Sequence, residues 1–258
     1  MNKCNGQEKS RGVLAFAKNT DAVNYEKIAE LSLRLAKHNL KLPVKVINTL
    51  PDQPWHNTRH DPETKQTVKW NNYGRYMAYE MSPWDETIVI DADYLVLTDN
   101  LNKLFETKHD YILADNMTLV GDNVHYNIRQ LAPVWATVFF FRKTPHAQAF
   151  FEMVGKIQRN WDYYRLLFSH TELQYRNDFA FAMARVVLDG YTKSVNTSMP
   201  LNLITLTEKL NSLEFKDELL LARYDTHADL LPRRDLHIFS KSWLQSPALE
   251  KFVNEATS

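Results

Sequence analysis

The sequence predicts an α/β protein built on a mostly parallel β-sheet that is flanked by helices. An apolar run, a helical pattern and a second apolar run follow one another between residues 12 and 48. That order of strand, helix and strand is typical of two parallel strands in one sheet. A later apolar strand, 87–90, stops at two carboxylates, Asp91 and Asp93. Carboxylates are rarely buried without a partner, so this strand end is the first candidate for a functional site.

The N-terminal part contains the strand, helix, strand unit. Residues 1–10 are polar and predict a disordered tail. The two strands are 12–17 and 42–48. Between them, 21–39 has apolar residues at helical spacing, namely Tyr25, Ile28, Leu31 and Leu35. Thr20 or Asp21 is available as the N-cap of this helix.

The remaining elements follow in order. Residues 49–66 are polar and contain several prolines, which predicts a long loop. Trp70, Tyr73 and Met77 mark one face of a helix that ends at SPWD. Beyond the strand 87–90 the pattern predicts a short helix, two strands and two longer helices, at 100–105, 110–115, 136–143, 146–157 and 172–188. Without internal repeats or low-complexity runs, residues 11–258 are expected to form one domain.

Composition disfavours several classes of function. Lys+Arg and Asp+Glu are equal at 31 each, so no net charge favours nucleic acid or an anionic membrane. The longest apolar stretch, VWATVFFF, is far shorter than the roughly 20 residues of a membrane span. Cys4 is the only cysteine, and the N-terminus lacks the apolar segment of a signal peptide. A cytoplasmic protein is therefore expected.

The glycines exclude the common phosphate-binding loops. The six glycines are scattered, with no GxGxxG, no GxxxxGK[ST] and no GxSxG pattern. Any phosphate must therefore be held by a metal ion or by basic side chains.

The Asp-x-Asp pair fits a metal. Asp91 and Asp93 lie one residue apart where a strand leaves the sheet, and their oxygens suit Mg²⁺ or Mn²⁺. Ligands of open α/β sheets bind beyond the carboxyl ends of the strands. Two solvated side chains at a strand-to-turn junction are the structural alternative, and Asp-x-Asp alone does not decide between the two.

The surrounding stretch, IVIDADYLVLTDNLNKLF, resembles the core motif of the GT-A glycosyltransferases, in particular the retaining glycogenin-like and bacterial galactosyltransferase-like group. In that family an apolar strand enters Asp-x-Asp, and an apolar triplet and a short helix follow. Other segments resemble family motifs in the same order along the chain: KNTDAVNY, WATVFFFRKTPHAQAFF, RNDFAFAMA and LHIFSKSWL.

The resemblance implies a GT-A (Rossmann-like) fold and a metal-dependent transfer of sugar from a nucleotide-diphosphate donor such as a UDP-sugar, with retention of configuration. The implied ligands of a Mn²⁺ or Mg²⁺ ion are Asp91, Asp93 and His237. The implied catalytic residues are Asp178, Arg75 and Lys241. The implied donor-binding residues are Ala15, Phe16, Ala17, Asn19, Tyr25, Arg75, Ala92 and Lys241. The implied acceptor residues are Trp135 and Thr137.

The sequence departs from the family pattern around the sugar and acceptor. Trp135 stands where the family has Asn, Thr137 where it has Gly, and Phe179 where it has Gln. A catalytically idle binding protein with the same fold is therefore one alternative. A sugar-1-phosphate nucleotidyltransferase is another, although the sequence lacks that class's Gly-rich, basic N-terminal loop.

Individual residues also have structural alternatives. His237 can be a hydrogen-bonded core residue, Arg75 and Lys241 solvated charges, and Asp178 the N-cap of its helix. The polar loop holds a loose group of potential zinc ligands, but a loop without a metal is favoured: His56, His60, Asp61 and Glu63. The aromatic segment 160–168 favours a packed helix face over base stacking.

The acceptor is not specified by these motifs. The sequence resembles proteins of large tailed phages, which implies modified phage DNA as one acceptor. The balanced charge does not favour that acceptor, because nucleic-acid binders usually carry an excess of basic residues.

Overall fold

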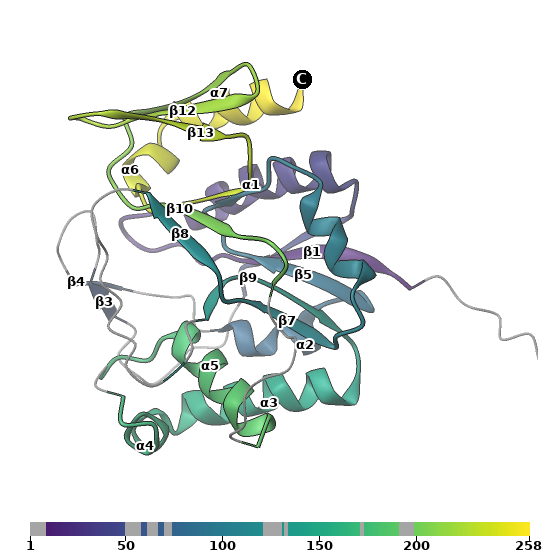
Figure 1. Ribbon diagram of the computed structural model, residues 1–258. Coiled ribbons are helices and arrows are strands. Elements are labelled where there is room, and N and C mark those ends of the chain that lie inside the picture. Colours follow the sequence, from purple (N-terminus) through teal and green to yellow (C-terminus); the bar gives the residue numbers. More distant parts are fainter. Residues whose placement is uncertain are drawn as a thin grey trace, which may run out of the picture.

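A computed structural model describes residues 9–49, 58–60, 67–69, 74–120, 131, 134–170, 173–190 and 199–258. Its described strands include a central five-stranded sheet in the order β2-β1-β5-β9-β7 (Figure 1). The strands are β1 (Arg11–Phe16), β2 (Val44–Ile47), β5 (Glu86–Ile90), β7 (Tyr111–Ala114) and β9 (Trp135–Arg142). β2, β1 and β5 run parallel, whereas β9 is antiparallel to both β5 and β7.

A second sheet lies beside the carboxyl end of β5. Its order is β6-β14-β10-β8. These strands are β6 (Tyr94–Leu95), β8 (Met117–Val120), β10 (Leu203–Leu206) and β14 (Leu236–Ile238). In the described parts of the two sheets, four of the seven strand pairings are parallel. The predicted α/β class with mainly parallel strands is therefore confirmed, with antiparallel pairings of β9 and between β6 and β14.

Helices cover both faces of the central sheet. On one side lie α1 (Tyr25–Leu40) and α7 (Pro247–Thr257), and on the other α3 (Pro145–Arg159) and α5 (Asn177–Leu188) (Figure 1). The shorter helices are η1 (Gly74–Met77), α2 (Ala78–Met81), η2 (Asn100–Glu106), α4 (Trp161–Leu167) and α6 (Lys241–Leu244). None of the helices in the described ranges is long and apolar enough to cross a bilayer.

Strand alternation divides the core into two halves. On β5, Ile88 and Ile90 pack on the α1 side, whereas Val89 packs on the α3 and α5 side. Phe139, Phe141, Phe150, Phe151 and Phe181 build much of the second half. Because successive strand residues point to opposite faces, a strand buried on both faces is a continuous apolar run. The runs that form β1, β5 and β9 are strands of this kind, whereas β2 is only partly buried.

Two small sheets lie outside these layers. A three-stranded antiparallel sheet consists of β11 (Ser212–Lys216), β12 (Leu219–Arg223) and β13 (Ala228–Pro232). The pair β3 (Thr58–His60) and β4 (Thr67–Lys69) interrupts the region predicted as a loop, so that prediction was wrong for residues 58–60.

Three local predictions also need correction. The N-cap of α1 is Asn24, whose side chain accepts from the Lys27 amide at 3.0 Å, because the chain makes a further turn after Thr20 and Asp21. The helix expected from Trp70 begins, within the described residues, at Gly74 as a 3-10 turn, and Trp70 and Tyr73 lie outside them. Most of the predicted disordered tail also lies outside the described residues, but Ser10 is described and hydrogen-bonds to Asp85.

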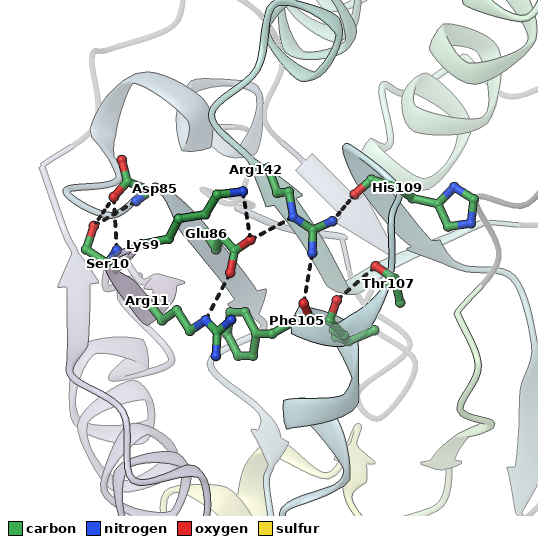
Figure 2. A network of polar contacts seen from close by, with 10 residues as sticks. Lys9, Ser10, Arg11, Asp85, Glu86, Phe105, Thr107, His109 and Arg142 are labelled. Atoms are coloured by element: carbon green, nitrogen blue, oxygen red, sulfur yellow. Dashed lines mark hydrogen bonds and ion pairs between the residues drawn. The ribbon is translucent and has the colours of Figure 1, made fainter. Parts of the chain in front are cut away.

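An ion network surrounds the buried Glu86 at the start of β5, and Figure 2 shows its polar contacts. Glu86, which is 2% exposed, accepts from Arg142 Nε at 2.7 Å and from Arg11 Nε at 2.9 Å. Ser10 Oγ donates to Asp85 Oδ2 at 2.7 Å beside it. The Arg142 guanidinium also donates to the carbonyl of Phe105 at 3.0 Å. The network joins β1, β5, β9 and η2.

Candidate functional site

The site lies where the chain leaves the central sheet at the end of β5 and joins the second sheet as β6. The Asp91 amide donates to the Thr137 carbonyl of β9 at 2.8 Å, which continues the pairing of β5 with β9 to the first aspartate of the motif. Two residues later, the carbonyl of Asp93 accepts from the Ile238 amide of β14 at 3.0 Å. His237 is paired with Tyr94 in the same ladder. The pairing of β6 with β14 therefore brings a late segment of the chain beside the Asp-x-Asp motif.

Asp91, Asp93 and His237 form one cluster. Each offers a ligand atom, and these atoms all lie within 4.8 Å of one another. His237 Nε2 lies 3.4 Å from Asp93 Oδ1. Asp93 and His237 are buried, whereas Asp91 is half-buried. The three predicted ligands are thus brought together in space.

Each carboxylate of the motif has a basic partner from another element. Arg75 Nη2, from η1, pairs with Asp91 Oδ1, and Lys241 Nζ, from α6, pairs with Asp93 Oδ2. Arg75 is 2% exposed and Lys241 7% exposed. Neither is a solvated surface charge, so that alternative was wrong for both residues.

These partners keep the Asp93 carboxylate ionised. Burial would raise its pKa, but the Lys241 ammonium and the His237 imidazole hold the pKa well below its usual value of 3.8. With the charges of Asp91 and Asp93 balanced by Arg75 and Lys241, the four charged side chains sum to zero.

The donor residues predicted from β1 lie at the same edge of the sheet. Ala15 is opposite Ile90 in the β1 and β5 pairing, so the residues after each leave the sheet together. Asn19 Oδ1 accepts from the Glu26 amide at 2.9 Å and holds the loop against the start of α1. The ring of Tyr25 lies 5.9 Å from Lys241 Nζ. Phe16, Ala17 and Ala92 are buried at this edge.

The predicted catalytic carboxylate, Asp178, is tied to β9. Its Oδ1 accepts from the Ala136 amide at 2.8 Å, and its Oδ2 pairs with Arg176 at 2.8 Å. The N-cap of α5 is Arg176, so the alternative of an N-cap role for Asp178 was wrong. Burial and the Asp178 carboxylate raise the pKa of the Tyr175 phenol, and the Arg75 guanidinium acts in the opposite direction.

The two predicted acceptor residues are on the same strand. Trp135 is 8% exposed and packs in the half of the core that faces α1, and Thr137 is 4% exposed. Their contact with an acceptor stays a prediction. In α4, Trp161 and Tyr164 are buried, as expected for a packed helix face. His56, Asp61 and Glu63 of the loose zinc group lie outside the described residues.

Sequence reasoning missed two buried polar residues, one that contacts His237 and one that precedes its strand. Thr205 Oγ1, on β10, lies 3.3 Å from His237 Nδ1. Asp235 accepts from the Leu97 amide at 2.8 Å, and burial raises its pKa to about 6. Burial and the facing Asp235 also raise the pKa of Tyr94. Asp235 stands two residues before His237, which is the only signal in the sequence that could have drawn attention to it.

Comparisons with known proteins give only distant similarity. No protein-family model matches the sequence, and no curated protein matches it significantly. Glycosyltransferase GlyE from Streptococcus pneumoniae TIGR4 has 15% identity and a TM-score of 0.43, over 74% of this chain and 46% of GlyE. An active-site mutant of LgtC has 13% identity and a TM-score of 0.49, over 95% and 94% of the two chains.

A glycosyltransferase involved in glycosylation of the major capsid of PBCV-1 has 12% identity and a TM-score of 0.37, over 76% of this chain and 80% of that one. The chain thus spans less than half of the length of GlyE. At TM-scores below 0.5, these similarities by themselves assign neither a family nor an activity.

Proposed function

We propose that this chain is a metal-dependent GT-A glycosyltransferase that takes a sugar from a nucleotide-diphosphate donor, with UDP-sugars as the first class to test. The observation that carries the proposal is the cluster of Asp91, Asp93 and His237 with Arg75 and Lys241 at its edge. The motif order along the sequence supports the same function independently. In this proposal residues 11–258 act as one catalytic domain.

The cluster suits a divalent cation by its donor chemistry. Two carboxylates and one imidazole offer oxygen and nitrogen ligands within 4.8 Å of one another, and Mn²⁺ accepts both kinds. Asp91, Asp93 and His237 would hold the ion. When bound, the ion supplies Lewis acidity to the phosphate oxygens of the donor.

The basic residues would bind and orient the diphosphate. Lys241 and Arg75 are buried cations held at the rim of the cluster, so they lose little freedom when they meet the leaving group. Tyr25 and the loop around Asn19 would border the nucleoside, because both follow β1 at the same sheet edge. Donor recognition is thus assigned to this edge.

Asp178 would stabilise positive charge at the anomeric carbon. Its two oxygens already accept hydrogen bonds from Ala136 and Arg176, which position the carboxylate. A carboxylate engaged in this way is better suited to electrostatic stabilisation than to nucleophilic attack. The resemblance of the motifs to the retaining group favours retention, and without a carboxylate placed as nucleophile we propose that the acceptor attacks on the side of the leaving group.

The test is release of nucleotide from a panel of nucleotide sugars. Purified protein with Mn²⁺ should hydrolyse one donor slowly, and adding the right acceptor should speed the release; modified phage DNA is one acceptor to include. Asp93→Asn should abolish the release while the protein keeps its fold. Persistent absence of nucleotide release with every donor would favour an idle binding protein. Formation of a nucleotide sugar from sugar 1-phosphate and a nucleoside triphosphate would instead identify a nucleotidyltransferase.

A further inference from the structure

Exposed apolar side chains gather on and beside α4, which lies at one corner of the molecule (Figure 1). In the described part of the chain six large hydrophobic side chains are exposed, and four of them form what we call the α4 face: Tyr163, Leu166, Leu167 and Leu173. Each of the four is more than half exposed. Trp161 Nε1 donates to the Leu173 carbonyl at 3.0 Å, which holds that residue beside the start of α4. Apolar side chains that gather in one place mark an interaction surface, whereas single exposed ones do not.

The helix is apolar on both of its sides. Tyr163, Leu166 and Leu167 are three and four positions apart, so their side chains are neighbours on the helix surface. Toward the core the same helix contributes Trp161 and Tyr164, which are both buried. A helix of a soluble protein normally has a polar side toward water, and one that is apolar all round is normally covered all round. The α4 face therefore lacks a covering partner in the isolated chain.

Two opposite charges border the α4 face. Arg165 Nε donates to Asp162 Oδ1 at 2.7 Å, one turn apart on the same side of the helix. A largely exposed carboxylate beside the apolar residues disfavours insertion into a bilayer, since helices that lie in membrane interfaces carry mainly Lys and Arg at that border. The chain as a whole has no net charge that would attract it to an anionic membrane.

The same two charges suit a second copy of the chain. In an isologous two-fold interface a surface meets itself, so its charges must be self-complementary. Two copies of α4 that pack antiparallel, with the two-fold axis midway between the charges, would place Asp162 opposite the partner's Arg165. Symmetry would repeat this pair on the other half. The apolar side chains would be covered at the centre and the charges would lie at the rim, which is the usual layout of an interface.

We propose that the α4 face is the two-fold interface of a homodimer. The proposal does not depend on the activity proposed above. Interfaces of standard size bury about 800 Å² on each partner, so the four apolar residues would form the centre and polar residues around them the rim. A few central residues normally carry most of the binding energy of an interface. Symmetry also makes each substitution act twice.

The first experiment measures the monomer–dimer equilibrium of the full chain by sedimentation over a dilution series. The wild type should be dimeric at high concentration and dissociate on dilution. Leu166→Ser should raise the Kd of the dimer at least about tenfold, because a central contact is lost on both halves. Leu230→Ser is the matched control, because Leu230 is also more than half exposed but lies on β13, in the small three-stranded sheet. It should leave the Kd unchanged.

The second experiment tests the pairing of the charges. Asp162→Lys and Arg165→Glu should each weaken the dimer at least about tenfold, because like charges then face each other across the interface. An equimolar mixture of the two variants should form a mixed dimer, in which each altered residue meets an opposite charge. Mixing cannot restore the ion pair inside either helix. Recovery in the mixture therefore separates pairing across the interface from a role of the two residues within α4.

Three results would overturn the proposal. The first is a wild type that stays monomeric at every concentration; if that monomer floats with lipid vesicles, the α4 face is a membrane surface instead. The second is a dimer that Leu166→Ser weakens no more than Leu230→Ser does. The third is a mixture of Asp162→Lys and Arg165→Glu that dimerises no better than each variant alone.

Discussion

Lys241→Met should strengthen the binding of Mn²⁺ to the free protein while it weakens the binding of UDP. In the structure Lys241 Nζ forms an ion pair with Asp93 Oδ2, and a metal ion would need a carboxylate oxygen of the same residue. A metal that binds the wild type must therefore compete with this ammonium. Once the ion pair is broken, Lys241 is available to the diphosphate.

The size of the effect follows from the burial of the pair. Both residues are less than a tenth exposed. Removing one partner of a buried pair typically costs about 3–5 kcal/mol, because the remaining charge is unpaired. Lys241→Met should therefore lose up to this amount of stability without metal. It should recover much of the loss when Mn²⁺ binds, which corresponds to at least a tenfold tighter Kd.

The assay is a Mn²⁺ titration by calorimetry, followed by a UDP titration in saturating Mn²⁺. Lys143→Met is the control, since Lys143 donates to the Ser82 carbonyl at 2.8 Å at the opposite end of the sheet. The control should match the wild type in both titrations. A Lys241→Met protein that binds Mn²⁺ no more tightly than the control would refute the competition between lysine and metal.

Three further outcomes are expected. Asp178→Asn keeps an acceptor for the Ala136 amide, so it should fold normally but lower both transfer and donor hydrolysis about 10²–10³-fold, measured as nucleotide release. Glu86→Gln should lower the unfolding free energy by about 3–5 kcal/mol in urea melts at pH 7. Burial would raise the pKa of Glu86, but Arg142 and Arg11 lower it below 4.5. The stability advantage of the wild type should therefore fade as the pH drops below 4.5. Asp235→Asn removes a carboxyl whose folded pKa is raised from 3.8 to about 6, so the variant should be more stable than the wild type by up to about 3 kcal/mol at pH 8, and this gap should close as the pH falls toward 4. An equal stability of the two proteins at pH 8 would show that the ionised Asp235 carboxylate does not destabilise the folded state.

The parts of the fold with a strong local signal could be predicted from the sequence. β1, β5 and β9 are buried on both faces, and their continuous apolar runs identify them directly. The helices α1 and α3 show regular apolar spacing, and their observed bounds differ from the predicted ones by only a few residues. Local patterns sufficed here because each element buries its own residues.

The second sheet was harder because its strands are short. β6 has two residues and β14 three, so neither shows a periodic pattern of its own. Their pairing depends on contacts between residues more than a hundred positions apart. The three predicted ligands could be named because motif order identified them, whereas the contact of Thr205 with His237 depends on strand order and leaves no trace in the local sequence.

The N-cap of α1 shows a different limit. Thr20, Asp21 and Asn24 are all suitable capping residues, and the sequence does not distinguish among them. The choice depends on the preceding turn, in which Thr20 Oγ1 accepts from the Val23 amide at 3.1 Å. Tertiary placement of the loop after β1 therefore decides where the helix begins.

The most direct test of metal-dependent donor binding is a calorimetric titration of the wild type with UDP, first in Mn²⁺ and then in EDTA. Without a cation the charges of Asp91, Asp93, Arg75 and Lys241 cancel, so the site has no net attraction for a diphosphate. We predict saturable binding in Mn²⁺ and none in EDTA, and loss of the Mn²⁺-dependent binding in Asp93→Asn. The same UDP affinity with and without the chelator would contradict the account.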